Sequence, residues 1–214
     1  LNNLAFALKG QKRLEDSAAL FQEILAARQS VEGDEDLEPG VANNLADAMY
    51  ALKRFDEART HAQAAVDQAR QLARQGRPDP ELPAYLTTLG QALAALHDPA
   101  AGDAFLQALA LRRQAIGDDN PRTWQALANA VFYLFNTRQF EAALPHAQRL
   151  YEARGSNPLG PATPVGAAFY GLILAELGRN DEAQEPLRRA WELFVAADAT
   201  NTSFAQRVKK ALAE

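Results

Sequence analysis

The chain has 214 residues, of which 48% are hydrophobic and 23% are charged, and it carries a formal net charge of −5 and no cysteine. The lack of cysteine excludes a disulfide framework, a thiol nucleophile and thiolate metal sites. The acidic balance argues against a nucleic-acid partner, because phosphate binding needs a concentrated basic face. No apolar run approaches the ~20 residues of a membrane span, so no membrane partner is expected. The composition does not fix the compartment, and of cytoplasm and periplasm we expect the cytoplasm.

One short pattern recurs five times along the chain. Asn-Asn-Leu-Ala stands at 2–5 and again at 43–46, and each related segment is followed, after a polar break, by a second apolar-striped segment. Each second segment carries a small residue near its start, and these residues are Ser17, Ala58, Gly102, Ala143 and Ala183, spaced 41, 44, 41 and 40 residues apart. Self-similarity at such a period indicates stacked supersecondary units.

Each unit is predicted to contain two helices joined by a short polar turn, because apolar residues recur at three- and four-residue spacing. In chain order the predicted units are 1–38, 39–80, 81–121, 122–160 and 161–198. In the third unit, an Asp-Pro pair at 98–99 predicts the start of the second helix. A capping helix is predicted over 201–214. Thr202 or Ser203 is its expected N-cap, with Gln206 completing a capping box.

The small residues predict a close approach between the two helices of each unit. Without a bulky substituent on either side, two antiparallel helices can pack closely where they cross. The expected facing pairs are Ala5 with Ser17, Ala46 with Ala58, Gly90 with Gly102, and Gly171 with Ala183. One such hairpin cannot bury its apolar face alone, whereas stacked neighbours can.

This pattern resembles the tetratricopeptide repeat over the whole chain. The longer period and the segment ALALRRQAIGDDNPRTWQALANA are similar to the kinesin-light-chain type of repeat. The resemblance implies an all-α fold, a right-handed superhelix of about five helical hairpins with a truncated first hairpin and a C-terminal capping helix. It also implies a concave groove, lined by the first helices, that holds a peptide or an extended protein segment.

The register of the first helices assigns residues to this groove. The candidate binding residues are Asn2, Asn43, Asn44, Asp47, Tyr50, Thr87, Gln91, Asn129, Phe132 and Phe169. Asparagine is a mediocre helix former, and its amide can both donate to and accept from a peptide backbone. The resemblance implies that Asn2, Asn43 and Asn129 contact the backbone of a ligand. The alternative is that these asparagines bond between neighbouring hairpins and bind nothing.

Toward the C-terminus the predicted groove becomes apolar, through Phe132, Phe135, Phe169 and Leu172. Three interpretations stay open at this point. A partner buries an apolar anchor there, the linker 155–164 folds over the cluster, or the phenylalanines belong to the core.

No constellation typical of catalysis or metal binding is found in the sequence. His61, His97 and His146 fall in three different units, without metal-ligand spacing between any two of them. We therefore expect neither an enzyme nor a cofactor. Chaperone-tail-binding tetratricopeptide domains carry Lys and Arg at groove positions that here read Asn2, Phe6, Asn44, Ala84 and Thr88. No binding of a C-terminal Glu-Glu-Val-Asp is expected.

The predicted function is a protein-interaction module that binds a peptide or protein segment in its groove. The resemblance places it in the C-terminal scaffold or sensory region of a larger bacterial signalling protein, such as a Ser/Thr kinase. Two alternatives remain, namely self-association into a homodimer and a non-catalytic flank that regulates an enzyme in cis.

Overall fold

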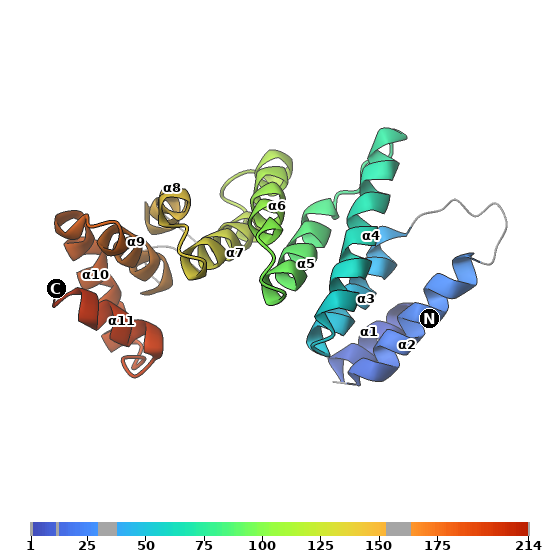
Figure 1. Ribbon diagram of the computed structural model, residues 1–214, viewed down its shortest axis with the longest axis horizontal. Coiled ribbons are helices and arrows are strands. Elements are labelled where there is room, and N and C mark those ends of the chain that lie inside the picture. Colours follow the sequence, from blue (N-terminus) through green and yellow to red (C-terminus); the bar gives the residue numbers. More distant parts are fainter. Residues whose placement is uncertain (1, 12, 30–37, 153–163, 214) are drawn as a thin grey trace. The chain divides into compact units, whose positions relative to one another are not determined.

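The computed structural model describes residues 2–11, 13–29, 38–152 and 164–213, and within these ranges the chain is all-α. The helices in chain order are α1 (Asn2–Gly10), α2 (Leu14–Gln29), α3 (Pro39–Ala51), α4 (Phe55–Arg74), α5 (Leu82–Ala95), α6 (Ala100–Ile116), α7 (Pro121–Asn136), α8 (Phe140–Glu152), α9 (Pro164–Glu176), α10 (Asn180–Ala196) and α11 (Ser203–Ala211) (Figure 1). The predicted all-α array of helical hairpins is confirmed. No helix in the described ranges is long and apolar enough to cross a membrane.

The helices gather into two compact units, residues 1–111 and 112–214. In the first unit, α1 packs on α2 and α3 on α4, while α2 and α4 each pack on the helix that follows. In the second unit, α7 packs on α8 and α9 on α10 (Figure 1). First helices of neighbouring hairpins also meet, α3 with α5 and α7 with α9. Each unit is therefore a stack of hairpins whose helices contact near neighbours in the sequence.

The predicted small residues lie at buried positions in the second helices. Ser17, Ala58, Gly102, Ala143 and Ala183 are all buried. The expected pairing of Ser17 with Ala5 is direct, because the Ser17 hydroxyl donates a hydrogen bond of 2.8 Å to the Ala5 carbonyl oxygen. Small side chains here let α1 and α2 approach until one side chain touches the other backbone.

The glycines of the first helices have different nearest neighbours from those expected. A Cβ atom added to Gly90 would lie 2.9 Å from the Phe105 ring, and one added to Gly171 would lie 2.7 Å from Leu187. These neighbours lie one helical turn beyond Gly102 and Ala183, the residues predicted to face them. The glycines therefore make room for a large apolar side chain of the second helix, rather than only for its backbone.

The polar turns between helices repeat one backbone conformation. Lys53, His97, Arg138 and Gly178 each follow a first helix and have φ between 58° and 73°. In each case the next backbone N–H bonds to the carbonyl five residues earlier, as from Arg54 to Met49 at 2.9 Å. This is the Schellman arrangement, which satisfies carbonyls left free at a helix end. The polar breaks in the sequence are therefore helix C-caps.

Two predicted helix starts can be compared with the structure. The Asp98 carboxylate accepts a hydrogen bond of 2.9 Å from the Ala100 N–H at the start of α6, as expected. At α11, Thr202 is the N-cap and accepts from the Ala205 N–H at 3.2 Å. The Gln206 amide bonds to the Thr200 carbonyl at 2.7 Å instead of closing a capping box. The extended backbone of Thr202 selects it over Ser203, which already lies inside the helix.

Candidate protein-binding face

Three helices of the second unit bring four phenylalanines together. Phe132 and Phe135 come from α7, Phe169 from α9 and Phe204 from α11, and we call this set the aromatic cluster. The Phe169 ring centroid lies 6.4 Å from that of Phe132, 5.2 Å from that of Phe135 and 4.9 Å from that of Phe204. Edge-to-face and tilted rings at such separations attract one another beyond their burial alone.

The aromatic cluster is partly open to solvent. Phe135 and Phe169 are 3% and 5% exposed, whereas Phe132 is 61% exposed. A hollow of about 410 Å³ lies beside the rings and is lined by Phe132, Phe135, Asn136, Val165, Phe169, Ser203, Phe204 and Arg207. An exposed aromatic ring beside a mostly apolar hollow is typical of a place where a partner side chain is buried.

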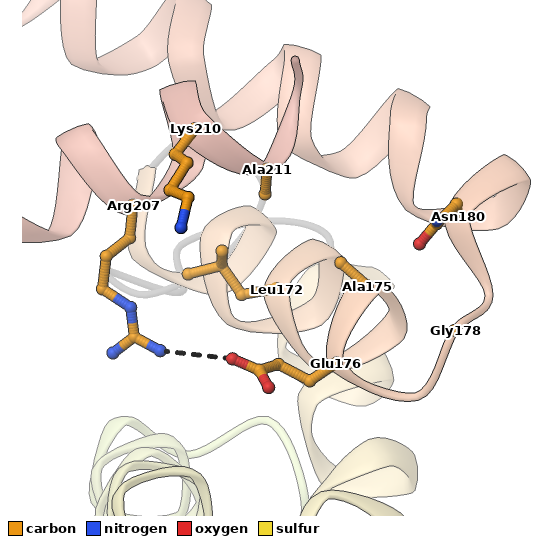
Figure 2. Close-up of a pocket in the computed structure, with 8 residues that line it drawn as sticks. All are labelled: Leu172, Ala175, Glu176, Gly178, Asn180, Arg207, Lys210 and Ala211. Atoms are coloured by element: carbon orange, nitrogen blue, oxygen red, sulfur yellow. Dashed lines mark ion pairs between the residues drawn. The ribbon is translucent and has the colours of Figure 1, made fainter. Parts of the chain in front are cut away.

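A second hollow, of about 430 Å³, adjoins Arg207 on α11. It is lined by Leu172, Ala175, Glu176, Gly178, Asn180, Arg207, Lys210 and Ala211 (Figure 2). Figure 2 shows Arg207 reaching from α11 toward Glu176 at the end of α9, 3.8 Å away. Arg138 lies 3.4 Å from the same carboxylate. The Arg207 guanidinium also lies 4.6 Å from the Phe135 ring centroid, so it borders both hollows.

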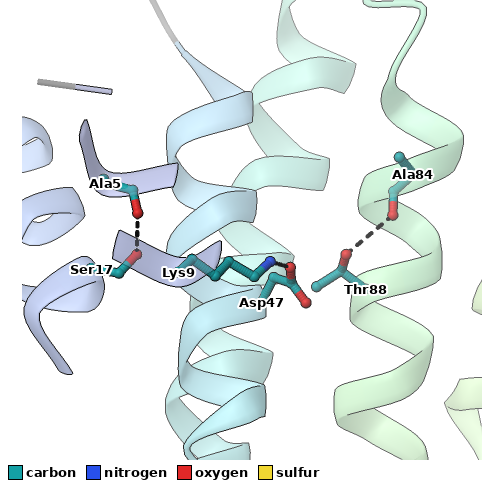
Figure 3. A network of polar contacts seen from close by, with 6 residues as sticks. All are labelled: Ala5, Lys9, Ser17, Asp47, Ala84 and Thr88. Carbon is teal, nitrogen blue, oxygen red and sulfur yellow. Dashed lines mark hydrogen bonds and ion pairs between the residues drawn. The ribbon is translucent and has the colours of Figure 1, made fainter. Parts of the chain in front are cut away.

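In the first unit, several predicted groove residues bind other parts of the chain. Asp47 on α3 forms an ion pair with Lys9 on α1, across the two neighbouring first helices (Figure 3). The Tyr50 ring packs on Phe55 with centroids 5.4 Å apart. Asp47 and Tyr50 therefore stabilise contacts within the fold, although both keep partly exposed side chains.

Asn44 lines a hollow of about 450 Å³ at the start of α3. The lining residues are Glu38, Pro39, Gly40, Val41, Asn44, Leu72, Arg77 and Asp79. Beside it, the Tyr85 hydroxyl donates to the Asp79 carboxylate at 3.0 Å. Burial and this hydrogen bond raise the pKa of Tyr85, so its hydroxyl stays protonated and remains a donor.

The predicted asparagines have unlike surroundings. The Asn2 side chain lies outside the described residues. The Asn43 Oδ1 atom is shielded from solvent and accepts no hydrogen bond. Asn129 accepts a bond of 3.1 Å from Gln125 on its own helix. Asn43 and Asn129 therefore have different surroundings, and their contact with a ligand stays a prediction.

The remaining polar candidates lie on α5. Thr87 is partly exposed and its hydroxyl bonds to the Pro83 carbonyl at 2.9 Å, within the helix. Thr88 is buried and bonds in the same way to the Ala84 carbonyl at 3.3 Å (Figure 3). Gln91 is partly exposed. The Thr87 and Thr88 hydroxyls thus donate to backbone carbonyls one turn earlier.

The comparisons with known proteins agree with this architecture. Residues 1–71 match the tetratricopeptide repeat family model. A putative kinesin light chain of Podosopora anserina with nearly identical TPR-like repeats superposes at a TM-score of 0.73, with 16% identity over 94% of this chain and 95% of that chain. BtubC (BKLC) from P. vanneervenii gives a TM-score of 0.71 and 17% identity, over 94% and 80%. The chain has the tetratricopeptide-repeat fold.

A further tetratricopeptide structure is similar over most of its length. YrrB, described as a TPR protein with an unusual peptide-binding site, gives a TM-score of 0.66 and 18% identity over 97% of this chain and 89% of that chain. No curated protein sequence matches the chain. The predicted resemblance to tetratricopeptide repeats of the kinesin-light-chain type is thus confirmed at the level of fold.

Two histidines of this tetratricopeptide array are partly buried. Burial lowers the pKa of His61 and of His146, and the positive charge of Arg113 adds to the effect at His146. Both imidazoles therefore become protonated only at a lower pH than a free histidine does. In the part of the chain that the structure describes, no group of three or more His, Cys, Asp or Glu could hold a metal ion.

The structure places at the candidate face two residues that the groove prediction did not include. Phe204 and Arg207 belong to the predicted capping helix, and both line the apolar hollow beside Phe132. The signal available in the sequence was the apolar stripe of the C-terminal segment, which carries an aromatic residue at its start. That stripe predicts a buried face, but not which helices it covers.

Proposed function

We propose that this chain is a protein-interaction module that binds an extended peptide or protein segment across its first helices, with the aromatic cluster as the anchoring site. The exposed Phe132 ring carries the proposal, because nothing about packing requires a phenylalanine that is 61% exposed beside an apolar hollow. A partner that buried an apolar side chain there would gain about 25 cal/mol for each Å² removed from water.

The wider context follows the family resemblance. We propose that the module is the scaffold or sensory region of a larger bacterial regulatory protein such as a Ser/Thr kinase, acting in the cytoplasm and without catalysis of its own. The peptide-binding tetratricopeptide protein YrrB supports the general role through its similar fold. In the first unit, the partly exposed Asn44 on α3 and Gln91 on α5 are proposed to contact polar groups of a ligand.

Two exposed apolar residues of the second unit allow a matched test. A library of random dodecapeptides is selected on the wild-type chain, and the recovered peptides are titrated against Phe132→Asp and Val195→Asp. Val195 is 54% exposed but lies on α10 and lines none of the three hollows. We expect Phe132→Asp to weaken binding at least ~10-fold and Val195→Asp to leave it unchanged. Equal affinities for both variants would refute the anchoring site.

Self-association is the second candidate function of the same surface, because a second copy of the chain can bury an exposed aromatic ring as well as a peptide can. The mass measured by sedimentation at several protein concentrations distinguishes self-association from peptide binding. A mass that rises with concentration in the wild type, and stays monomeric in Phe132→Asp, would assign the aromatic cluster to a dimer interface. A constant monomer mass would leave peptide binding as its role.

A further inference from the structure

The second hollow, of about 430 Å³, is polar where the hollow beside Phe132 is apolar. Two cationic side chains of α11, Arg207 and Lys210, line it, and Asn180 at the start of α10 lines it as well. Figure 2 shows Arg207 and Lys210 pointing from α11 toward the end of α9. A guanidinium, an ammonium and an amide from two helices therefore offer hydrogen-bond donors to one space.

The charges that line the second hollow are mostly positive. Its one acidic lining residue is Glu176, which accepts a hydrogen bond of 3.4 Å from Arg138. Arg207 lies 3.8 Å from the same carboxylate, which is too long for a hydrogen bond. In the first turn of α10, Glu182 is bound by Arg179 at 2.6 Å. The hollow therefore suits an anion that accepts hydrogen bonds from Arg207.

We propose that the second hollow binds the phosphate group of a phosphorylated side chain. The planar fork of Arg207 matches two phosphate oxygens, and Lys210 and the Asn180 amide supply donors for the third. A carboxylate has two oxygens, which the guanidinium fork alone can satisfy. The number of donor groups around the hollow therefore favours a phosphate over a carboxylate.

The neighbouring apolar hollow indicates which molecule carries the phosphate. Arg207 lines both hollows, and its guanidinium lies 4.6 Å from the Phe135 ring centroid. A polypeptide segment that buries an apolar side chain beside Phe132 would therefore place a nearby phosphorylated residue at Arg207. In naming that segment the inference rests on the proposed function, whereas the phosphate site itself depends on Arg207, Lys210 and Asn180.

The alternative role for the two α11 cations is a structural one. The carboxyl end of a helix carries about half a negative charge, and cations nearby stabilise it. In that role Arg207 and Lys210 would complement the end of α9 and Glu176 without binding any ligand. Their replacement would then change stability and leave no phosphate binding to lose.

The probe is a blocked tripeptide, Ala-phosphoserine-Ala, titrated at constant ionic strength into the isotope-labelled chain. Nuclear magnetic resonance follows the backbone amides of Gly178 and Asn180, which line the hollow. At pH ~7.5 the phosphate carries nearly two negative charges. We expect saturable shifts of these amides, and at least ~5-fold weaker binding of a matched peptide that carries glutamate instead of phosphoserine.

Arg207→Gln is expected to weaken binding of the phosphoserine peptide at least ~5-fold, because it removes the charged fork. Lys209→Gln is the matched control, since it makes the same change of charge on the same helix. The Lys209 ammonium lies 5.7 Å from the Trp191 ring centroid and lines none of the three hollows. We expect this control to bind the peptide like the wild type.

Three results would each overturn the proposal. They are the lack of saturable shifts at Gly178 and Asn180, equal binding of the glutamate peptide, and equal weakening by Arg207→Gln and Lys209→Gln. If circular dichroism shows that Arg207→Gln has lost helix, Lys210→Gln takes its place, with the same loss expected. The phosphoserine peptide has no apolar anchor for Phe132, so this test can fail while the peptide-library test succeeds, and the reverse.

Discussion

Small residues decide how closely the two helices of a hairpin approach. The Cβ position at Gly171 would lie 2.7 Å from a Leu187 carbon and 3.0 Å from the Leu187 backbone nitrogen. At Gly90 the nearest atoms belong to the Phe105 ring, at 2.9 Å. A ring can tilt away, whereas backbone cannot move without shifting the helix. Gly171 is therefore the stricter requirement of the two.

We predict that Gly171→Ala lowers the free energy of unfolding by about 1–2 kcal/mol. Overpacking against Leu187 costs more than the ~1 kcal/mol gained from the better helix propensity of alanine. Gly10→Ala is the control, because a Cβ at that helical position meets nothing within 4 Å. That change should stabilise by up to ~1 kcal/mol. Urea denaturation followed by circular dichroism measures both, and a stabilised Gly171→Ala would contradict the proposed packing.

At the scale of the element, α3, α5, α7 and α9 each end in a turn residue with a left-handed backbone conformation. Glycine takes this conformation without cost, and the fifth hairpin uses it at Gly178 with φ 73°. The second hairpin places Lys53 there with φ 62°, which an L side chain rarely adopts. The repeated cap hydrogen bonds outweigh this local cost, and the turn is retained whatever residue occupies it.

Substitutions at Lys53 and at Gly178 are expected to change the free energy of unfolding in opposite directions. Lys53→Gly should raise the free energy of unfolding by about 0.5–1 kcal/mol, because it removes the left-handed strain from an exposed residue. Gly178→Ala should lower it by about 1 kcal/mol, since a Cβ there meets nothing within 4 Å and only the backbone conformation opposes it. Thermal unfolding compares the two variants, and a shift of the same sign in both would contradict the account.

At the scale of the molecule, stability is built from contacts between helices that are near in the sequence. Within the second unit α9 packs on α8, α10 and α11, and within the first α3 packs on α2, α4 and α5. In such an array, free energy is approximately a sum over hairpins and their interfaces. A single substitution should therefore change the stability of the hairpin that contains it, and of its neighbours, more than that of distant hairpins.

Amide hydrogen exchange tests this locality. We predict that Gly171→Ala speeds exchange in α9, α10 and α11 and leaves the amides of α3 and α4 close to their wild-type rates. The reason is that the lost packing lies between α9 and α10, where Gly171 meets Leu187. Uniformly faster exchange across both units would instead show one cooperative fold without local opening.

Much of the fold could be predicted because its signals are local. The recurrence of Ser17, Ala58 and their equivalents marks buried helix crossings, and the polar breaks mark helix C-caps. The candidate binding face was harder to predict, since the contacts of its residues depend on neighbours far away in the chain. Asp47 was assigned to the groove by register, and its ion pair with Lys9 could not be read from that register. The repeat boundaries and the ligand role of the asparagines stay predictions.

The sequence by itself determined the hairpins, because helical periodicity, small crossing residues and turn chemistry act over a few residues at a time. The tertiary structure decided which side chains form the aromatic cluster, which is the proposed anchoring site. Phe135 and Phe204 are distant in sequence, and their rings meet only because α11 packs onto α9 and reaches α7. That contact depends on how whole helices stack, and no local pattern encodes the stacking of helices that are not neighbours in the chain.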